Sequence, residues 1–257
     1  MFKNAIAVIT GAGQGLGKAT AHRLANQGVK VVITDISKEL AEKTVSEIGN
    51  DNAIAGIADV TKEDDVKNML LDVKNKWGST HSLNILVNCA GIAPPIKTLG
   101  KKGPHPLDAY TNVLMVNTVG TFNMIRLCAE QMSTNDVDNH GCRGVIVNTA
   151  SVAAYDGQIG QAAYASSKAA VVGMTLPIAR DLSRTGIRVN TIAPGLFMTP
   201  MMEGLPEKVR NDLASTVPFP SRLGNPDEYA HLVQAIVENP MLNGEVIRLD
   251  GALRMQP

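Results

Sequence analysis

Thr10-Gly11-Ala12-Gly13-Gln14-Gly15-Leu16-Gly17 is the stretch of sequence that decides the fold. It follows an apolar run, Ala5–Thr10, and leads into an amphipathic run that begins at Gly17. Glycines here allow a tight turn that Cβ atoms would block, so that backbone can approach a pyrophosphate at the N-terminus of a helix. The stretch predicts a strand, a dinucleotide-binding turn and a helix, with cofactor contacts at Gly11, Gln14, Gly15, Leu16 and Gly17. The alternative is an ordinary glycine turn.

Apolar runs typical of strands alternate with amphipathic runs typical of helices along the whole chain. The expected strands are Ala5–Thr10, Lys30–Thr34, Ala53–Ala58, Leu83–Asn88, Gly144–Thr149, Ile187–Ala193 and Glu245–Leu249. The expected helices are Gly17–Asn26, Lys38–Ile48, Lys62–Trp77, Leu107–Met132, Gln161–Thr185 and Pro226–Glu238. Such alternation predicts an α/β fold. We expect a Rossmann-type, doubly wound parallel sheet of seven strands with helices on both faces, in a single domain over residues 1–257.

Two segments interrupt this alternation. Ala93–Pro106 is a proline-bearing insert, and Pro194–Phe219 is a long connection with a possible short helix near Glu207–Ala214. Long connections in compact domains are often functional lids. The second segment also carries apolar and methionine side chains, and we therefore expect a substrate loop over residues 194–219. The alternatives are a surface loop or a segment that packs on the core.

Composition excludes several classes of function. The 24 basic and 24 acidic residues balance, and Lys101-Lys102 is the only Lys/Arg pair, so we expect no autonomous nucleic-acid binding. The three cysteines lack a CxxC spacing, which favours reduced thiols, and the histidines lack a ligand spacing, so we expect no metal site. No apolar run reaches the ~18 residues of a membrane span. A first strand near Asn4 leaves no room for a cleavable targeting segment.

Asp35 closes the second expected strand. A carboxylate there can accept hydrogen bonds from the ribose hydroxyls of an adenosine. It would repel a 2′-phosphate, because like charges ~4 Å apart cost about 4 kcal/mol at an effective dielectric near 20. The Gly11–Gly17 turn contains no Arg or Lys that could offset this. The sequence therefore favours NAD over NADP. The alternative role for Asp35 is that of N-cap to the following helix.

Further cofactor contacts are expected where other strands end. Asp59-Val60 follows the third strand, and Asn88-Cys89-Ala90-Gly91 follows the fourth. Open α/β sheets bind their ligands at the carboxyl ends of the strands.

Tyr164 and Lys168 form the candidate catalytic pair. They are four residues apart in a helical run and so lie on one face of it. A free tyrosine has a pKa near 10, and lowering it to about 7 requires roughly 4 kcal/mol, which a nearby ammonium and a positive nicotinamide can supply. Ser151, after the fifth strand, can hydrogen-bond the same substrate oxygen. The amide of Asn117, in the preceding helix, can bind a water that links Lys168 to solvent.

Each of these features has an ordinary structural explanation when it is taken alone, but their order along the chain is specific. The glycine motif, the N-x-A-G at Asn88–Gly91, Asn117, Ser151, Tyr164-x-x-x-Lys168 and Pro194-Gly195 together resemble the short-chain dehydrogenase/reductase family. The resemblance covers nearly the whole chain and implies nicotinamide-dependent oxidation or reduction, with Tyr164 as acid/base. Cys89 is a departure, because the family often has Asn there.

Longer strings resemble one branch of this family, the mitochondrial 3-hydroxyacyl-CoA dehydrogenases. The strings include GMTLPIARD at Gly173–Asp181 and NGEVIRLDGALRMQP at Asn243–Pro257. This resemblance implies NAD-dependent oxidation of the 3-hydroxyl of short or branched acyl-CoA, with steroid and other secondary alcohols as further substrates. It also implies a homotetramer and a mitochondrial location, with the cytoplasm as the alternative.

The resemblance assigns roles residue by residue. It implies cofactor contacts at Gln14, Leu16, Asp35, Asp59, Val60, Cys89, Tyr164, Lys168, Pro194, Gly195, Phe197 and Thr199. It implies substrate contacts at Ser151, Gln158 and Tyr164.

Two other functions remain open at this point. One is an NADPH-dependent 3-oxoacyl reductase of fatty-acid synthesis, against which Asp35 and the lack of turn cations argue. The other is a partner-binding scaffold, such as a subunit of a mitochondrial tRNA-processing complex. Intact Ser151, Tyr164 and Lys168 argue against a role without catalysis.

Overall fold

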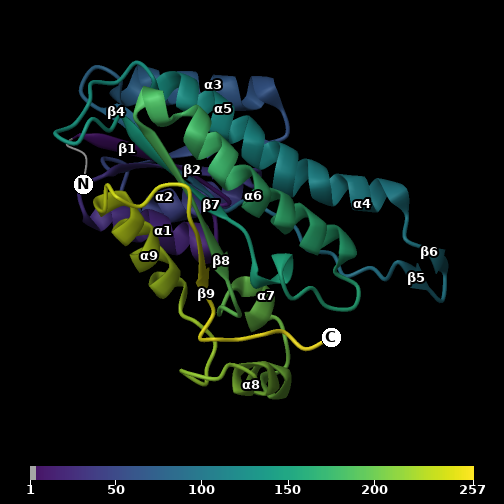
Figure 1. Ribbon diagram of the computed structural model, residues 1–257. Coiled ribbons are helices and arrows are strands. Elements are labelled where there is room, and N and C mark those ends of the chain that lie inside the picture. Colours follow the sequence, from purple (N-terminus) through teal and green to yellow (C-terminus); the bar gives the residue numbers. More distant parts are fainter. Residues whose placement is uncertain (1–3) are drawn as a thin grey trace.

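A seven-stranded parallel sheet forms the centre of the protein (Figure 1). The computed structural model describes residues 4–257, apart from the side chain of Met201. The strands of the sheet are β1 (Ala5–Thr10), β2 (Lys30–Asp35), β3 (Ala53–Ile57), β4 (Ser82–Asn88), β7 (Gly144–Thr149), β8 (Ile187–Pro194) and β9 (Val246–Leu249). These are the seven expected strands, and the predicted fold class is confirmed.

The strand order β3-β2-β1-β4-β7-β8-β9 places a reversal between β1 and β4. The chain builds outward from β1 in one direction and then, from β4, in the other. Thr10 at the end of β1 pairs with Thr34 of β2 and with Asn88 of β4, so these strands end at the same level. Such a reversal opens a crevice at the carboxyl ends of the strands, where open α/β sheets bind ligands.

Helices cover both faces of the sheet. On one face lie α1 (Gly15–Asn26), α2 (Lys38–Ile48) and α9 (Pro226–Glu238). On the other lie α3 (Glu63–Trp77), α5 (Thr121–Met132) and α6 (Ala162–Asp181). Figure 1 shows these two layers on either side of the strands.

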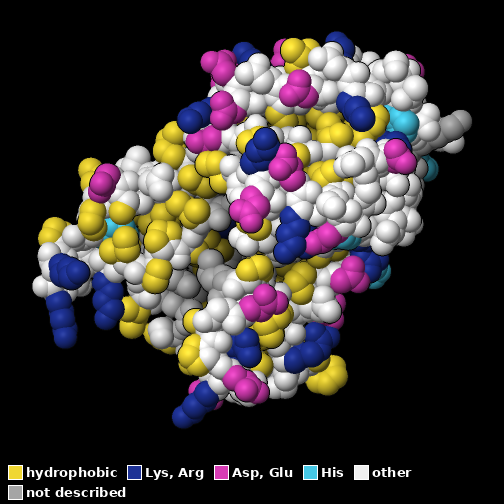
Figure 2. Space-filling view, turned by 180° about the vertical axis from the view of Figure 1, so that it is seen from behind, with side chains coloured by type: hydrophobic (Ala, Val, Ile, Leu, Met, Phe, Trp, Pro, Cys, Tyr) yellow, Lys and Arg dark blue, Asp and Glu magenta, His cyan; other side chains and the backbone are white. Residues whose placement is uncertain are grey.

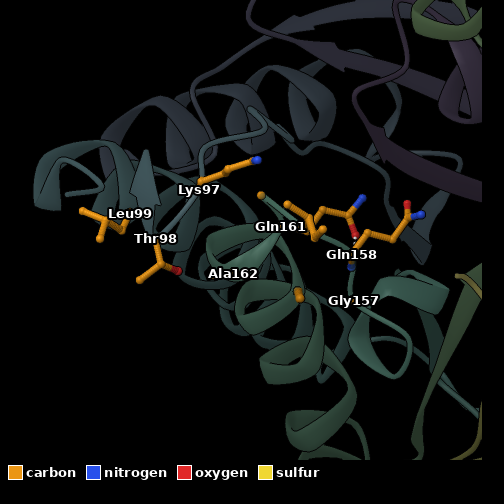
Figure 3. Close-up of a pocket in the computed structure, with 10 residues that line it drawn as sticks. Lys97, Thr98, Leu99, Gly157, Gln158, Gln161 and Ala162 are labelled. Carbon is orange, nitrogen blue, oxygen red and sulfur yellow. Dashed lines mark hydrogen bonds between the residues drawn. The ribbon is translucent and has the colours of Figure 1, made fainter. Parts of the chain in front are cut away.

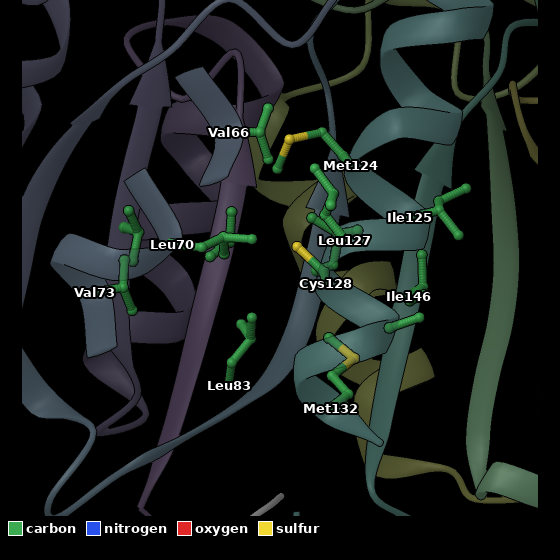
Figure 4. Packing of buried hydrophobic residues seen from close by; sticks show 14 of the residues in the cluster. Val66, Leu70, Val73, Leu83, Met124, Ile125, Leu127, Cys128, Met132 and Ile146 are labelled. Carbon is green, nitrogen blue, oxygen red and sulfur yellow. The ribbon is translucent and has the colours of Figure 1, made fainter. Parts of the chain in front are cut away.

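The core on the α3 and α5 side shows why these segments are helical. Val66, Leu70 and Val73 recur at helical spacing on α3 and face Met124 and Cys128 of α5 (Figure 4). Leu83 of β4 and Ile146 of β7 close the cluster from the sheet. Burying one such aliphatic side chain contributes about 1.5–3 kcal/mol, so packing holds these helices in place more than local propensity does.

The long helix expected over Leu107–Met132 is interrupted. It consists of α4 (Leu107–Leu114), a π-helical stretch (Met115–Gly120) and α5. A π turn accommodates one extra residue and commonly marks a functional position. Asn117 lies inside this stretch, and Gly120 lets the helix approach Val60, because a Cβ on Gly120 would lie 2.6 Å from Val60 Cγ2.

The two irregular segments contain more structure than expected. The insert forms a short antiparallel hairpin of β5 (Leu99–Gly100) and β6 (Gly103–Pro104), with Lys101-Lys102 at its turn. After β8 come α7 (Pro200–Glu203) and α8 (Glu207–Ser215), so the short helix expected near Glu207–Ala214 is confirmed. Figure 1 shows α8 at the periphery, and none of its residues is buried.

Arg188 fastens the last helix to the sheet. It is buried in β8 and its guanidinium donates to the carbonyls of Ile236, Val237 and Leu242, at 2.8–2.9 Å. These carbonyls lie at and beyond the C-terminal end of α9, where backbone acceptors lack intrahelical partners. Near the start of α9, Asp227 pairs with Arg23 of α1. Within residues 4–257, no helix has both the length and the apolar character needed to cross a membrane.

Candidate active site

Close backbone contacts determine the glycine turn between β1 and α1. A Cβ on Gly17 would lie 2.4 Å from the carbonyl oxygen of Gly11, and one on Gly11 would lie 2.9 Å from the backbone nitrogen of Ala90. Gly11 also has a φ of +60°, in the left-handed region. A larger residue at either position would therefore push the start of α1 away from β1 and β4.

Gly15 is less crowded than these two glycines. A Cβ there would make ordinary van der Waals contacts with Thr199 and Pro200, at 3.7 Å from each. The first-turn N–H groups of α1 lack intrahelical acceptors, and the N-cap residue Gln14 makes no side-chain cap among the described residues. Gly15, Thr199 and the N-terminus of α1 thus form a cradle that fits a pyrophosphate.

Asp35 lies beside this turn. Its carboxylate accepts hydrogen bonds from the backbone N–H groups of Gly13 and Ser37, each at 3.0 Å. Ser37, and not Asp35, is the N-cap of α2, since its hydroxyl accepts from Leu40 N–H. The helix-cap role for Asp35 is therefore wrong. A carboxylate offers about four acceptor positions, which leaves two for the hydroxyls of a ribose.

Asp59 and Val60 lie at the same edge but differ in availability. Asp59 Oδ1 accepts from the N–H and the hydroxyl of Thr61. Burial raises the pKa of Asp59, but these bonds outweigh it and hold the pKa below its usual range. The Val60 side chain is buried against Gly120 and its carbonyl accepts from Asn123. The Val60 side chain thus belongs to the core, and the expected cofactor contact at Val60 stays a prediction.

The segment Asn88-Cys89-Ala90-Gly91 supports the site mainly through its backbone. Asn88 is buried and its amide donates to Asn148, which joins β4 to β7; a cofactor contact at Asn88 stays a prediction. The hydroxyl of Thr10 accepts from the N–H groups of both Cys89 and Ala90. This brings Gly91 to an exposed position beside the catalytic groups, where a Cβ would lie 3.1 Å from Asn117 Oδ1 and 3.4 Å from Lys168 Nζ.

The long loop over residues 194–219 begins with Pro194, Gly195 and Phe197. Pro194 ends β8, and Gly195 passes so close to Asp250 that a Cβ would lie 2.9 Å from the Asp250 Cα. The ring of Phe197 is buried against Gly224 and belongs to the core of the α1 and α9 face. The ring is thus held by packing on the core, and the expected cofactor contact at Phe197 stays a prediction.

The catalytic residues expected from the sequence lie together at the carboxyl end of β7. Tyr164 and Lys168 share one face of α6, and Lys168 Nζ lies 5.8 Å from the centre of the Tyr164 ring. Ser151 follows β7, and its hydroxyl accepts from Ala153 N–H and acts on the nearby Tyr164 phenol. Burial raises the pKa of Tyr164 and the bond with Ser151 lowers it, so that the pKa stays above 10. The expected lowering by Lys168 is therefore not found among the protein groups alone.

Asn117 makes several hydrogen bonds within the protein, and its expected contact with a water stays a prediction. Its Oδ1 accepts from Ile92 N–H, while its Nδ2 donates to the Ile92 carbonyl and to Ser167 Oγ. Both amide N–H groups are thus used, and only an acceptor position on Oδ1 remains for a water. Asn117 clamps the segment after β4 to α6, one residue before Lys168.

Lys168 is almost fully buried. Its Nζ donates to the carbonyl of Thr149 at 2.8 Å. Burial lowers the pKa of Lys168 to about 8, and the nearby Cys89 works weakly in the opposite direction. The lysine is therefore a charge that the fold holds at some cost, which is typical of functional positions.

Gln158 lines a pocket of about 420 Å³ between the insert and the start of α6. Figure 3 shows Gln158 and Gln161 opposite Lys97, Thr98 and Leu99 of the insert. The amide nitrogen of Gln158 donates to the carbonyl of Gln256 near the C-terminus.

Figure 2 shows hydrophobic side chains gathered around a hollow on the face turned away from the viewer in Figure 1. No group of metal-ligating side chains occurs within residues 4–257.

Three residues of the site were given no role in the sequence analysis. Thr10 fixes the segment after β4, Thr149 binds Lys168 through its carbonyl, and Tyr229 of α9 hydrogen-bonds the Thr149 hydroxyl at 2.7 Å. Thr10 and Thr149 each end a strand, which is the one signal that pointed to them. Tyr229 occurs in an amphipathic helix among core positions and carries no signal.

Comparison with known proteins agrees with this geometry. The pattern of the short chain dehydrogenase family matches residues 5–210. This chain belongs to that family of oxidoreductases.

Its relatives include 3-hydroxyacyl-CoA dehydrogenases type-2. It is 58% identical to the one from Drosophila melanogaster over all of both chains. It is 59% identical to the one from Homo sapiens, over 99% of this chain and 97% of the human protein. The crystal structure of 3-hydroxyacyl-CoA dehydrogenase type-2 from Mycobacterium avium matches with a TM-score of 0.92 and 40% identity, over 100% of this chain and 98% of that one.

The buried lysine predicts a pH dependence of stability. Lys168 keeps its proton up to its usual pKa of 10.5 when the chain is unfolded, but only up to about 8 when it is folded. The unfolded state therefore binds more protons between these values, and the lysine should make the free energy of unfolding rise with pH across this window. Lys168→Met removes the effect. In urea unfolding from pH 7 to 10.5, the free energy of unfolding of wild type should rise relative to that of Lys168→Met. The free-energy difference between wild type and Lys208→Met, an exposed control, should stay the same across this range. A free-energy difference between wild type and Lys168→Met that does not change with pH would contradict this prediction.

Proposed function

We propose that this chain is an NAD-dependent dehydrogenase that oxidises the 3-hydroxyl of short or branched 3-hydroxyacyl-CoA. The observation that carries the proposal is the meeting of Ser151, Tyr164 and Lys168 beside a glycine cradle that fits a dinucleotide. The printed names of the relatives supply the substrate class. By the resemblance of its sequence strings we place the chain in mitochondria, and cell fractionation tests that location.

The side chains divide the chemistry among themselves. Bound NAD would accept the hydride from the substrate carbon, and its positive nicotinamide would favour the phenolate of Tyr164. Ser151 orients the substrate hydroxyl, Tyr164 removes the hydroxyl proton, and the carbon–oxygen double bond forms. Lys168 adds positive charge near the Tyr164 ring and would hold the nicotinamide ribose of bound NAD.

Removing the Tyr164 hydroxyl tests the chemistry and the substrate together. Tyr164→Phe keeps the ring but cannot take the proton, so kcat should fall about 10²- to 10⁴-fold while NAD binding is nearly retained. The assay compares 3-hydroxyacyl-CoAs with steroid alcohols and reads NADH absorbance. Tyr110→Phe, on α4, is the control. Near-normal activity of Tyr164→Phe would remove Tyr164 from the mechanism, and an inactive wild type on every acyl-CoA would remove the substrate class.

Asp35 supports NAD as the cofactor. Its carboxylate is held beside the glycine turn by Gly13 and Ser37, and it would lie against a 2′-phosphate. The nearest cation in sequence, Lys38, is exposed and pairs with Glu42. These contacts also weigh against the NADPH-dependent reductase.

The cofactor preference follows from this charge. NAD should exceed NADP by more than about tenfold in kcat/KM, because a like-charge contact costs several times RT. Asp35→Ser should narrow the ratio, and Asp51→Ser, at an exposed turn, should leave it unchanged. A wild type that prefers NADP would show that Asp35 does not select the cofactor.

The loop over residues 194–219 is proposed to close over the acyl chain. Leu196, Met198, Met202 and Leu205 are only partly buried, and α8 buries none of its residues. Few buried apolar contacts mean low local stability, which a lid requires. Methionine adapts to differently shaped apolar ligands.

Hydrogen exchange across residues 196–215 tests the lid. Exchange should be fast in the free protein and slow when NAD and acyl-CoA are both present, since closure buries the loop. Met202→Gln should raise KM for acyl-CoA more than KM for NAD. The exposed Met241→Gln serves as the control. Unchanged exchange with a normal KM would leave these residues a packing role only.

A homotetramer is proposed from the resemblance and from one apolar stripe. Met115, Val119 and Phe122 follow helical spacing along the π stretch and α5, and all three are exposed, as is Leu176 of α6. Several large apolar side chains exposed on neighbouring helices are typical of a subunit interface.

A charge in this stripe should dissociate the assembly. Phe122→Asp places a carboxylate where apolar contact is expected, so its mass by sedimentation equilibrium should fall below that of wild type. Leu71→Asp changes an equally exposed residue on α3 and should leave the mass unchanged. A monomeric wild type would rule out the tetramer.

A further inference from the structure

Three polar side chains from distant segments meet beneath Lys168. They are Cys89 after β4, Thr149 at the end of β7 and Tyr229 in the first turn of α9. The Tyr229 hydroxyl lies 2.7 Å from Thr149 Oγ1 and 3.6 Å from Cys89 Sγ, and Thr149 Oγ1 lies 3.5 Å from Cys89 Sγ. Tyr229 is fully buried. None of the three takes part in the chemistry described above.

These contacts form a closed ring. Thr149 can donate to Cys89, Cys89 to Tyr229, and Tyr229 to Thr149, so each group donates once and accepts once. Burial raises the pKa of the Cys89 thiol and, more strongly, that of the Tyr229 phenol, so both keep the protons that this ring needs. A polar group buried without a partner is costly, and a closed ring leaves none of these three hydroxyl and thiol groups without one.

A single hydrogen bond connects Thr149 of this ring to the catalytic lysine. The side chain of Thr149 is fixed by Cys89 and Tyr229, while the carbonyl of the same residue accepts from Lys168 Nζ at 2.8 Å. The pairing of β4 with β7 stops at Asn88 and Asn148, so Thr149 has no ladder partner on the β4 side. The ring replaces that missing pairing at the point where the carbonyl must be held.

We propose that Tyr229 and Thr149 are positioning residues that set the place of Lys168 relative to Tyr164, and thereby the pH range in which the enzyme works. The titratable groups around Lys168 are Tyr164 on its own helix, Cys89 after β4 and Tyr229 on α9 beyond Thr149. Among them Cys89 acts directly on the charge of Lys168. The inference rests on the proposed dehydrogenase activity, which the wild-type enzyme tests separately.

Two variants open the ring while keeping its shape. Tyr229→Phe removes one hydroxyl and Thr149→Val removes another. In each, the lysine should be held less firmly, and in the complex with NAD it should stabilise the Tyr164 phenolate less. The acidic limb of kcat against pH should then move up by about half a unit to one unit, since one hydrogen bond is worth about that much. The KM for NAD should rise because the lysine also holds the ribose. Thr149→Ser, which retains the hydroxyl, should restore the wild-type profile.

Thr175→Val is the matched control. Thr175 on α6 is fully buried and shares a hydrogen bond of 2.6 Å with Thr191, but it does not contact the ring. Its loss should lower the Tm without moving the pH profile.

NMR of labelled lysine gives a readout that needs no substrate. The pKa of Lys168 should change in Tyr229→Phe and Thr149→Val and not in Thr175→Val. The proposal would be overturned if Tyr229→Phe and Thr149→Val both had the same pH profile and the same Lys168 pKa as wild type. If wild type is inactive on acyl-CoA but the Lys168 pKa changes in the ring variants, the positioning role of the ring is supported. In that case only the proposed substrate class is rejected.

Discussion

The contact of Gly17 with the carbonyl of Gly11 is the constraint on which the site depends. Because no side chain separates them, α1 begins directly beneath the end of β1, and its free N–H groups point into the crevice between β1 and β4. The same turn brings Gly11 against Ala90, while Thr10 binds the backbone of Cys89 and Ala90. One close approach thus fixes the cofactor end of the site and the segment that faces the catalytic residues.

The catalytic end is built from pieces that no single element could position. Ser151 comes from the end of β7, Tyr164 and Lys168 from α6, and Asn117 from the π-helical stretch. Asn117 binds both Ile92 and Ser167, so it fixes the distance between the segment after β4 and the helix that carries the lysine. The extra residue of a π turn is a local cost that rigid placement of a functional side chain can justify.

The parts that could be predicted from the sequence are those set by local spacing. Strand periodicity predicted all seven strands, and four-residue spacing placed Tyr164 and Lys168 on one face. The features that the sequence did not predict depend on packing between distant segments. Phe197 reads as an apolar loop residue, but its ring is buried and packs against Gly224. Val60 and Gly120 meet in the same way. Tyr229 reads as one more core position of α9, since only the fold brings Thr149 within reach.

The attachment of α9 has a consequence for synthesis. Its clamps, Arg23 and Arg188, and most of its apolar partners on the sheet precede it in the chain. On the ribosome, β1, β4 and β7 are therefore complete while their outer face near α1 still lacks its cover. That face is lined by Ile85, Val87, Val145 and Val147. An uncovered apolar strand face makes a nascent chain prone to aggregation, and chaperones bind such surfaces. The synthesis and docking of α9 therefore shorten the time for which this apolar face is open to misassembly.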